Sequence, residues 1–138
     1  MKHDNNGWCA KCEEILNRYP GFDQDLRNWF TLIHAKFQDF HISCAGRGHD
    51  EQETLFLKGA TRAHWGQSAH NWNKAFDGFF LIDGEYNLDR ARFDEIAKEL
   101  PAYIDWYGSP GQAFPELPHF ENAYWKGQRD EGLIQLVE

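Results

Sequence analysis

Cysteine is scarce in this chain, and long apolar runs are missing. The sequence has 3 cysteines, at positions 9, 12 and 44, and so small and odd a number excludes a fold built on disulfides. No stretch of about 18 apolar residues occurs, as a membrane-spanning helix would require. The first seven residues also lack the apolar centre of a signal peptide. We therefore expect a protein made in a cytoplasm, with no membrane insertion.

Basic residues are outnumbered as well. Lys and Arg total 14 against 22 Asp and Glu, which gives a formal net charge of -8. Because nucleic-acid-binding domains normally carry a basic patch, we expect no nucleic-acid partner. Apolar residues are nevertheless 41% of the chain and aromatic residues 16%, enough for a core. The 138 residues contain no repeat or long linker, so we expect a single domain over 1–138 and a monomer.

Helical periodicity is clearest near the N-terminus. Apolar residues recur at helical spacing over 8–19 and again over 26–37, and Asp23 is placed to cap the second helix. Asp50 with Glu53 predicts a capped short helix that ends near Lys58. A further helical pattern starts near Asp89 and extends toward Trp106.

Strand patterns are shorter and lie later in the chain. Alternation predicts a strand over 40–44, an apolar run predicts one over 75–82, and 119–123 fits a last short strand. The intervening stretches 60–72, 83–87 and 108–118 read as loops or turns. Separate helices and short strands indicate an α+β fold with a small antiparallel sheet and flanking helices. We expect a helical N-terminal part, 1–39, and a core over 40–123.

An acidic residue interrupts the most apolar of these strands. Asp77 lies within the run 75–82, where a buried carboxylate is costly unless a cation neutralises it. The alternative is an edge position at which Asp77 faces water. Two histidines, His70 and His119, together with Asp77 suffice to hold zinc and leave a fourth position open, as catalytic zinc sites do. His70 and Asp77 are seven residues apart, so they converge only if His70 precedes the strand.

A glutamate precedes the last histidine by three residues. Pro118 favours an extended backbone before it, so His119 and Glu121 project to the same side, where Glu121 can orient a ligand. Glu116 lies beyond the proline and can approach the open metal position, where it would move protons. Its alternative interpretation is an ordinary solvated loop glutamate.

These blocks resemble a known enzyme family. The motifs are Gly66-x-Ser68-x-His70-x-x-x-x-Ala75-x-Asp77, Glu116-x-Pro118-His119-Phe120-Glu121 and, upstream, Ala45-Gly46-Arg47 followed by Glu51-Gln52 and Leu55-Phe56. Together they are similar to the zinc D-alanyl-D-alanine carboxypeptidase and L-alanyl-D-glutamate peptidase family, which includes vancomycin-resistance dipeptidases and phage endolysins. The similarity runs from about Phe40 to Glu121. The family usually has glycine three residues after the first histidine, where this chain has Asn73, a residue that tolerates a left-handed backbone.

The resemblance implies a fold, a cofactor and residue roles. It implies the Hedgehog/D,D-peptidase-like fold and one Zn²⁺ per chain bound by His70, Asp77 and His119. Glu116 would be the general base and then the general acid, Arg47 would bind the substrate carbonyl or the oxyanion, and Ser68 would assist at the metal or substrate. The implied substrate is the stem peptide of peptidoglycan. A phage endolysin that waits in the host cytoplasm and acts on the cell wall fits best, and a bacterial D-Ala-D-Ala carboxypeptidase or dipeptidase is the nearest alternative.

Two other interpretations use different residues. Cys9-x-x-Cys12 is half of a structural zinc site, with Cys44 as a possible third ligand and a histidine as the fourth; the candidates are His3, His34, His41 and His49. A redox role for this pair would require a βαβ pattern, which is absent. A non-catalytic wall-binding module would instead use aromatic side chains, of which Trp65, Trp72 and Trp125 are the best candidates for exposure. We favour neither His49 nor His64 as a ligand.

Overall fold

A five-stranded antiparallel sheet organises the molecule. The computed structural model describes residues 1–108 and 116–137. The strand order is β1-β2-β5-β4, and β3 pairs with β2. The strands are β1 (Phe40–Cys44), β2 (Ala75–Ile82), β3 (Glu85–Asn87), β4 (Ile104–Trp106) and β5 (His119–Asn122). The fold is therefore α+β with a small antiparallel sheet, as the sequence predicts.

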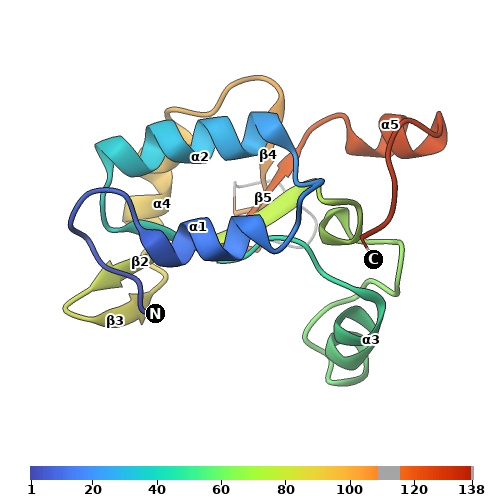
Figure 1. Ribbon diagram of the computed structural model, residues 1–138, viewed down its shortest axis with the longest axis horizontal. Helices are drawn as coiled ribbons and strands as arrows, with labels where there is room; N and C mark the ends of the chain where they lie inside the picture. The colour runs from blue at the N-terminus through green and yellow to red at the C-terminus, as the bar shows by residue number, and fades with distance from the viewer. Residues whose placement is uncertain (109–115, 138) are drawn as a thin grey trace.

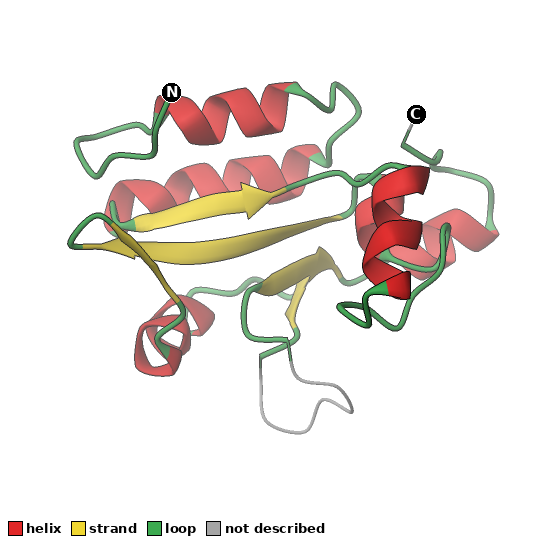
Figure 2. Cartoon of the chain, turned by 90° about the horizontal axis from the view of Figure 1, so that it is seen from below, coloured by secondary structure: helices red, strands yellow, loops and turns green. Residues whose placement is uncertain are grey.

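The helices flank this sheet (Figure 1). They are α1 (Ala10–Asn17), α2 (Gln24–Lys36), α3 (His49–Leu57), α4 (Arg90–Ala97) and α5 (Trp125–Asp130), with a short 3-10 helix, η1, at Ala69–Trp72. Figure 2 shows α1 and α2 running alongside the two long strands, whereas α3 and α5 gather near one end of them. Among the residues described, no helix is long and apolar enough to cross a membrane.

Aromatic rings fill the core between α2, α4 and the sheet. Phe30, Phe40, Phe76, Phe93 and Phe120 are fully buried, and the Phe76 and Phe120 rings stack with centroids 5.2 Å apart. Within β2 the even-numbered phenylalanines enter this core because side chains alternate across a strand. The other face of β2 is thereby left for Asp77.

Gly78 is required by the packing of this strand. A Cβ at Gly78 would lie 2.4 Å from a ring carbon of Phe40, on the neighbouring strand. Only a hydrogen at this position lets the ring cross the sheet face. Gly78 faces the core, whereas its neighbours Asp77 and Phe79 face the other side of β2. A change in the packing at Gly78 therefore displaces both neighbours.

Several predicted boundaries are wrong in detail. Asp50 does not cap α3: the N-cap is Gly48, and no side chain makes the capping bond. The Glu53 carboxylate instead accepts the backbone N–H of Trp65 at 2.6 Å. The predicted turn 83–87 contains strand β3, because the tight turn at Asp83 and Gly84 returns the chain along β2.

The helix after Asp89 is shorter than its pattern suggests. Asp89 does cap α4, but α4 ends at Ala97, and the apolar residues that follow form the strand β4 beside β5. The loop predicted at 60–72 ends in η1. Of the loop predicted at 108–118, residues 109–115 lie outside the described residues.

Candidate metal centre

Sheet register brings two of the three predicted ligands together. β2 and β5 pair antiparallel with Asp77 directly opposite His119, so their side chains project from the same face. His119 Nδ1 lies 3.4 Å from Asp77 Oδ1. His70 Nε2 lies 3.2 Å from the same oxygen. The donor atoms of these three residues all lie within 4.8 Å of one another.

His70 reaches the centre because it precedes β2, as the odd spacing to Asp77 requires. It lies on η1, where the Ser68 hydroxyl caps the turn and accepts the His70 N–H at 3.2 Å. The chain then reverses at Asn73, which has a left-handed backbone with φ 58°. Asparagine therefore serves at this position, where the resembled family has glycine.

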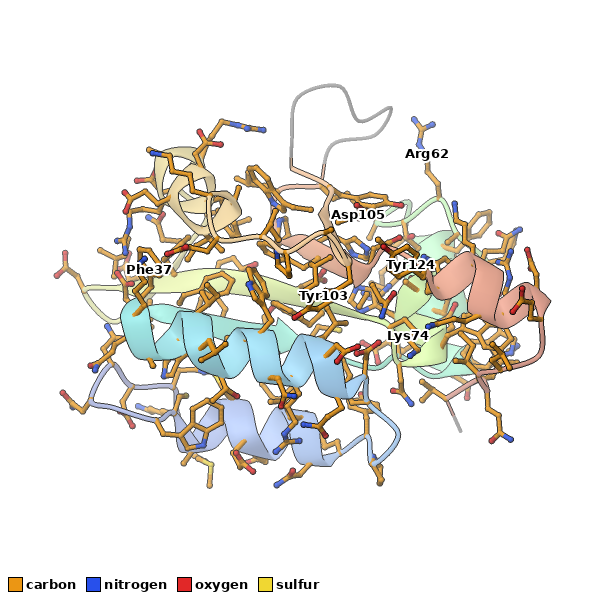
Figure 3. The ribbon with its side chains drawn as sticks, turned by 90° about the horizontal axis from the view of Figure 1, so that it is seen from above. Phe37, Arg62, Lys74, Tyr103, Asp105 and Tyr124 are labelled. Atoms are coloured by element: carbon orange, nitrogen blue, oxygen red, sulfur yellow. The ribbon has the colours of Figure 1, made fainter. Side chains whose placement is uncertain are left out.

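Contacts with α2 hold this reversal in place. The Asp23 N–H donates to the Asn73 carbonyl at 3.0 Å. Lys74, seen near the start of α2 in Figure 3, lies 2.9 Å from Asp23 Oδ2. The same carboxylate also accepts from Asn122 at the end of β5. Asp23, predicted as a helix cap and confirmed as one, thus also ties together the segments that carry His70 and His119.

Hydrogen bonds at the far nitrogens aim both imidazoles inward. His70 Nδ1 lies 2.7 Å from the Ala45 carbonyl oxygen, and His119 Nε2 lies 2.7 Å from Glu121 Oε1. Both acceptors fix an N–H on the outer nitrogen, so the inner nitrogens, once deprotonated, can offer their lone pairs to a cation beside Asp77. Such partners are typical of metal-bound histidines.

Glu121 is the most heavily used of these partners. It is buried, and its second oxygen accepts from the Trp125 indole at 2.7 Å and from the Tyr107 hydroxyl at 3.1 Å. Burial and the neighbouring Glu121 carboxylate raise the pKa of Tyr107, so this hydroxyl stays protonated and remains a donor. Glu121 is held in one orientation by three donors, as the sequence pattern 119–121 anticipates for a ligand-orienting carboxylate.

The charges of the cluster are strongly coupled. Burial opposes ionisation of both His70 and Asp77, but their mutual attraction outweighs it, so the pKa of His70 rises and that of Asp77 falls. Burial likewise opposes a charge on His119, yet its hydrogen bonds to Asp77 and Glu121 raise its pKa. The site therefore favours positive charge beside Asp77, which a divalent cation can supply in place of protons.

The donor set and its spacing fit zinc. Zinc–nitrogen and zinc–oxygen bonds of about 2.0–2.2 Å in a tetrahedron place neighbouring donors roughly 3.4 Å apart. The observed separations of 3.2 and 3.4 Å to Asp77 Oδ1 match this edge. Three protein donors leave one tetrahedral position for water or substrate, which distinguishes catalytic from structural zinc.

A cavity lies over Asp77 and the two histidines, and Arg47 lines it. It is 9% exposed, and its Nη2 lies 3.8 Å from Asp77 Oδ2. Gln52, fully buried on α3, accepts from Arg47 Nη1 at 3.1 Å and holds the guanidinium in place. Within the described part of the chain, Arg47 Nε has no hydrogen-bond partner. The guanidinium charge at the cavity wall is suited to attract an oxygen of a ligand.

Glu116 and Ser68 lie where the cavity opens. Glu116 Oε2 is 3.8 Å from His119 Nδ1, and its side chain is 51% exposed. Glu116 and Ser68 line both the cavity over Asp77 and an adjoining cleft beside Trp125. Arg62, which extends from the loop between α3 and η1 (Figure 3), and Lys126 line that cleft as well.

Other residues play roles that the sequence patterns did not reveal. Asn71 is fully buried; its amide donates to the Arg47 carbonyl and to Gln52, and its oxygen accepts two backbone N–H groups. Only its position beside His70 hinted at this. Trp125 is buried against Glu121 rather than exposed, which corrects that expectation, and Trp72 is half-buried with its indole N–H bonded to Gly66.

His49 and His64 lie apart from the cluster. His49 pairs with the adjacent Asp50 on the surface. His64 contacts Glu53 and packs against Phe56. Neither joins the group formed by His70, Asp77 and His119.

Comparison with known proteins identifies a fold relative. No protein-family model matches this sequence, and no curated protein is significantly similar to it. Among solved structures, the chain is similar to the Serratia marcescens L-Ala D-Glu endopeptidase ChiX, with a TM-score of 0.69 and 18% sequence identity over 90% of this chain and 95% of that one. The chain thus shares its fold with that endopeptidase.

Proposed function

We propose that this protein is a zinc-dependent peptidoglycan peptidase, an L-alanyl-D-glutamate endopeptidase that acts in host-cell lysis as a phage endolysin. The observation that carries the proposal is the convergence of His70 and His119 on Asp77, with Glu116 at the open side. The fold shared with an L-Ala D-Glu endopeptidase supports the same conclusion.

The mechanism assigns the metal to these three ligands. A zinc ion bound there would lower the pKa of a bound water to about 7 and polarise the scissile carbonyl. Glu116 accepts the proton of the water that attacks the carbonyl carbon. It then donates this proton to the amine that leaves when the carbon–nitrogen bond breaks. Because the Glu116 side chain is half-exposed at the cavity mouth, it can approach both the attacking water and the nitrogen of the leaving amine.

Arg47 supplies the charge for the developing oxyanion. Gln52 fixes its guanidinium beside Asp77, and a preoriented cation stabilises negative charge on the carbonyl oxygen. Ser68 caps η1 through its hydroxyl oxygen and still has a proton to donate to substrate at the cavity edge. We infer that Ser68 both positions His70 and contacts the peptide.

The adjoining cleft suits an acidic peptide. Arg62 and Lys126 line it together with Glu116, and D-glutamate brings a carboxylate that such cations attract. A D-Ala-D-Ala terminus also ends in a carboxylate, so the preference for cleavage next to D-glutamate rests on the fold relative.

Digestion of purified peptidoglycan tests the proposal. We expect wild type to release new L-alanine and D-glutamate ends, identified by mass spectrometry, and Glu116→Gln to lower the rate by about 10²–10⁴-fold while keeping its metal. Free D-alanine or D-Ala-D-Ala as the product would identify a trimming enzyme instead. Binding to the wall without any cleavage by the zinc-loaded protein would favour a wall-binding module.

The lysis role has its own test. Purified protein added to bacteria with a permeabilised outer membrane should clear the suspension, and Glu116→Gln should not. Cleavage of isolated peptidoglycan without clearing of these cells would keep the peptidase and remove the lysin role.

A further inference from the structure

Four metal-binding side chains meet at the start of α1, away from the site described above. They are His3, Cys9, Cys12 and His41, and their donor atoms all lie within 4.8 Å of one another. Cys9 and Cys12 flank the first turn of α1, with Cys9 as its N-cap. His41 comes from β1, and His3 comes from the irregular segment before α1. Cys9, Cys12 and His41 are fully buried.

The separations between these atoms match a tetrahedral metal site. His3 Nδ1 lies 3.3 Å from Cys9 Sγ and 3.5 Å from Cys12 Sγ. His41 Nδ1 lies 3.5 Å from Cys12 Sγ. Zinc–sulfur bonds of about 2.3 Å and zinc–nitrogen bonds of about 2.0–2.1 Å at tetrahedral angles place sulfur and nitrogen about 3.6 Å apart.

Neighbouring groups prepare the sulfurs and one imidazole for a cation. The Cys12 N–H lies 3.4 Å from Cys9 Sγ, and the Ile42 N–H lies 3.4 Å from Cys12 Sγ. Backbone N–H groups directed at the sulfurs are outer partners that orient them toward the centre of the cluster. His41 Nε2 lies 2.7 Å from Asn5 Oδ1, which places the N–H there and leaves the Nδ1 lone pair toward the sulfurs. Outer partners of this kind accompany metal-bound histidines.

The remaining ligands suggested by the sequence are excluded by their contacts. Cys44 lies beside Arg47, 3.9 Å from Nη2, and faces the other site. Both ring nitrogens of His34 contact backbone carbonyl oxygens, Phe40 at 2.6 Å and Gly7 at 2.9 Å. His49 is exposed on α3. The partner of Cys9-x-x-Cys12 is therefore a pair of histidines, His3 and His41.

We propose that His3, Cys9, Cys12 and His41 bind a second metal ion, a structural zinc, in a closed four-ligand site. Two thiolates neutralise the charge of Zn²⁺, and four protein ligands leave no position for substrate. The ion would fasten residues 1–9, which contain no helix or strand, to α1 and β1. The His3 ring also packs against Phe79, with centroids 4.9 Å apart, so the site would brace the strand that carries Asp77.

Cobalt substitution tests this site independently of catalysis. The full chain is purified under reducing conditions, and Co²⁺ replaces the bound metal. We expect thiolate-to-cobalt charge-transfer absorption in the near ultraviolet, which a site made only of histidine and aspartate cannot produce. Metal analysis should give two ions per chain for wild type.

Variants separate the two sites. Cys12→Ser should lose at least half of the charge-transfer absorption, because one of the two thiolates is removed, whereas Cys44→Ser and His70→Ala should retain all of it. If Cys12→Ser fails to fold, His3→Ala, in the irregular segment before α1, provides a second test of metal binding. Loss of an outer partner of a metal ligand lowers metal affinity by about 10–100-fold. Because His3 would be a ligand itself, His3→Ala should lower the Co²⁺ affinity by more than that.

Three results would overturn the proposal. One is a single metal ion in wild type with no thiolate absorption. Another is undiminished absorption in folded Cys12→Ser, or absorption that disappears in Cys44→Ser. The third is unchanged Co²⁺ affinity in folded His3→Ala. None of these results depends on peptidase activity, so the failure of this site and the failure of the proposed function are distinguishable.

Discussion

The two clusters of side chains that could hold a metal ion differ in their number of donors and in their exposure. The cluster of His70, Asp77 and His119 (the open site) offers three donors, borders a cavity and has Glu116 3.8 Å from one imidazole. The cluster of His3, Cys9, Cys12 and His41 (the closed site) offers four donors, two of them sulfur, and three of its members are fully buried. The number of protein donors and the access of substrate, rather than the affinity for the metal, distinguish a catalytic metal site from a structural one.

The two clusters share a scaffold. In the register of β1 with β2, Cys44 lies opposite Asp77 and His41 lies opposite Phe79. Asp77 of the first cluster lies on one face of β2. His41 of the second cluster pairs with Phe79, which lies on the same face of β2 two positions further along. A disturbance of β2 should reach both, whereas loss of a ligand should affect only one.

Removing a ligand of the open site should have the largest effect on activity. His70→Ala is expected to lose one metal ion and to reduce peptidoglycan cleavage to background, because the metal and the residues around it act as a unit. Its cobalt charge-transfer absorption should remain. Loss of both metal ions in a folded His70→Ala protein would show that the clusters are not separate sites.

Removing a ligand of the closed site should mainly reduce stability. For Cys12→Ser we expect the free energy of unfolding to fall by about 4 kcal/mol or more, as in other losses of structural metal. Thermal unfolding should start roughly 10 °C lower, while cleavage persists at low temperature. Cys44→Ser is the control for removal of a thiol and should change the free energy of unfolding and the temperature of unfolding little. Unchanged stability of folded Cys12→Ser would contradict the structural role.

A smaller effect is expected from the carboxylate behind His119. Glu121→Gln keeps the size of the side chain but weakens the bond to His119 Nε2, so metal affinity at the open site should fall by about 10–100-fold. Competition with a chelator measures this change. Tyr107→Phe, which removes only one donor to Glu121, should shift the affinity less. An equal or larger loss in Tyr107→Phe would argue against Glu121 as the orienting group.

The mildest change acts on the shared strand. Gly78→Ala forces a Cβ against the Phe40 ring, and overpacking of this kind costs about 1–3 kcal/mol of stability. Because Gly78 lies between Asp77 and Phe79, metal binding at both sites should weaken together. Gly127→Ala, where a Cβ meets no atom within 4 Å, is the control. Denaturant unfolding and metal titration check this pair.

Local patterns explain which features could be read from the sequence. The run 75–82 gave β2 with its true bounds, and the stripe over 26–37 gave α2, because each pattern is long and consistent. Asp77 was recognisable as a candidate ligand because a carboxylate buried in an apolar strand is costly unless a cation neutralises it. Strand β4 was missed because its three residues also continue a helical pattern, and only pairing with β5 decides between them.

The closed site shows where sequence reasoning stops. Cys9-x-x-Cys12 announces half a site, but His3 lies in a segment without periodicity and His41 on a strand 29 residues beyond Cys12. Cys44 seemed the more natural third ligand, yet the irregularity between Ile42 and Cys44 in β1 places it opposite Asp77. The choice of ligands thus depended on tertiary contacts that no local pattern encodes.

Anomalous X-ray scattering at the zinc edge, on crystals of the zinc-loaded full chain, tests the account most directly. Two peaks are predicted, one bonded to His70, Asp77 and His119 with a fourth position facing Glu116, and one enclosed by His3, Cys9, Cys12 and His41. The absence of a peak at the first position would contradict the catalytic centre and with it the proposed peptidase. A peak at the first position alone would leave the peptidase intact and remove the structural zinc.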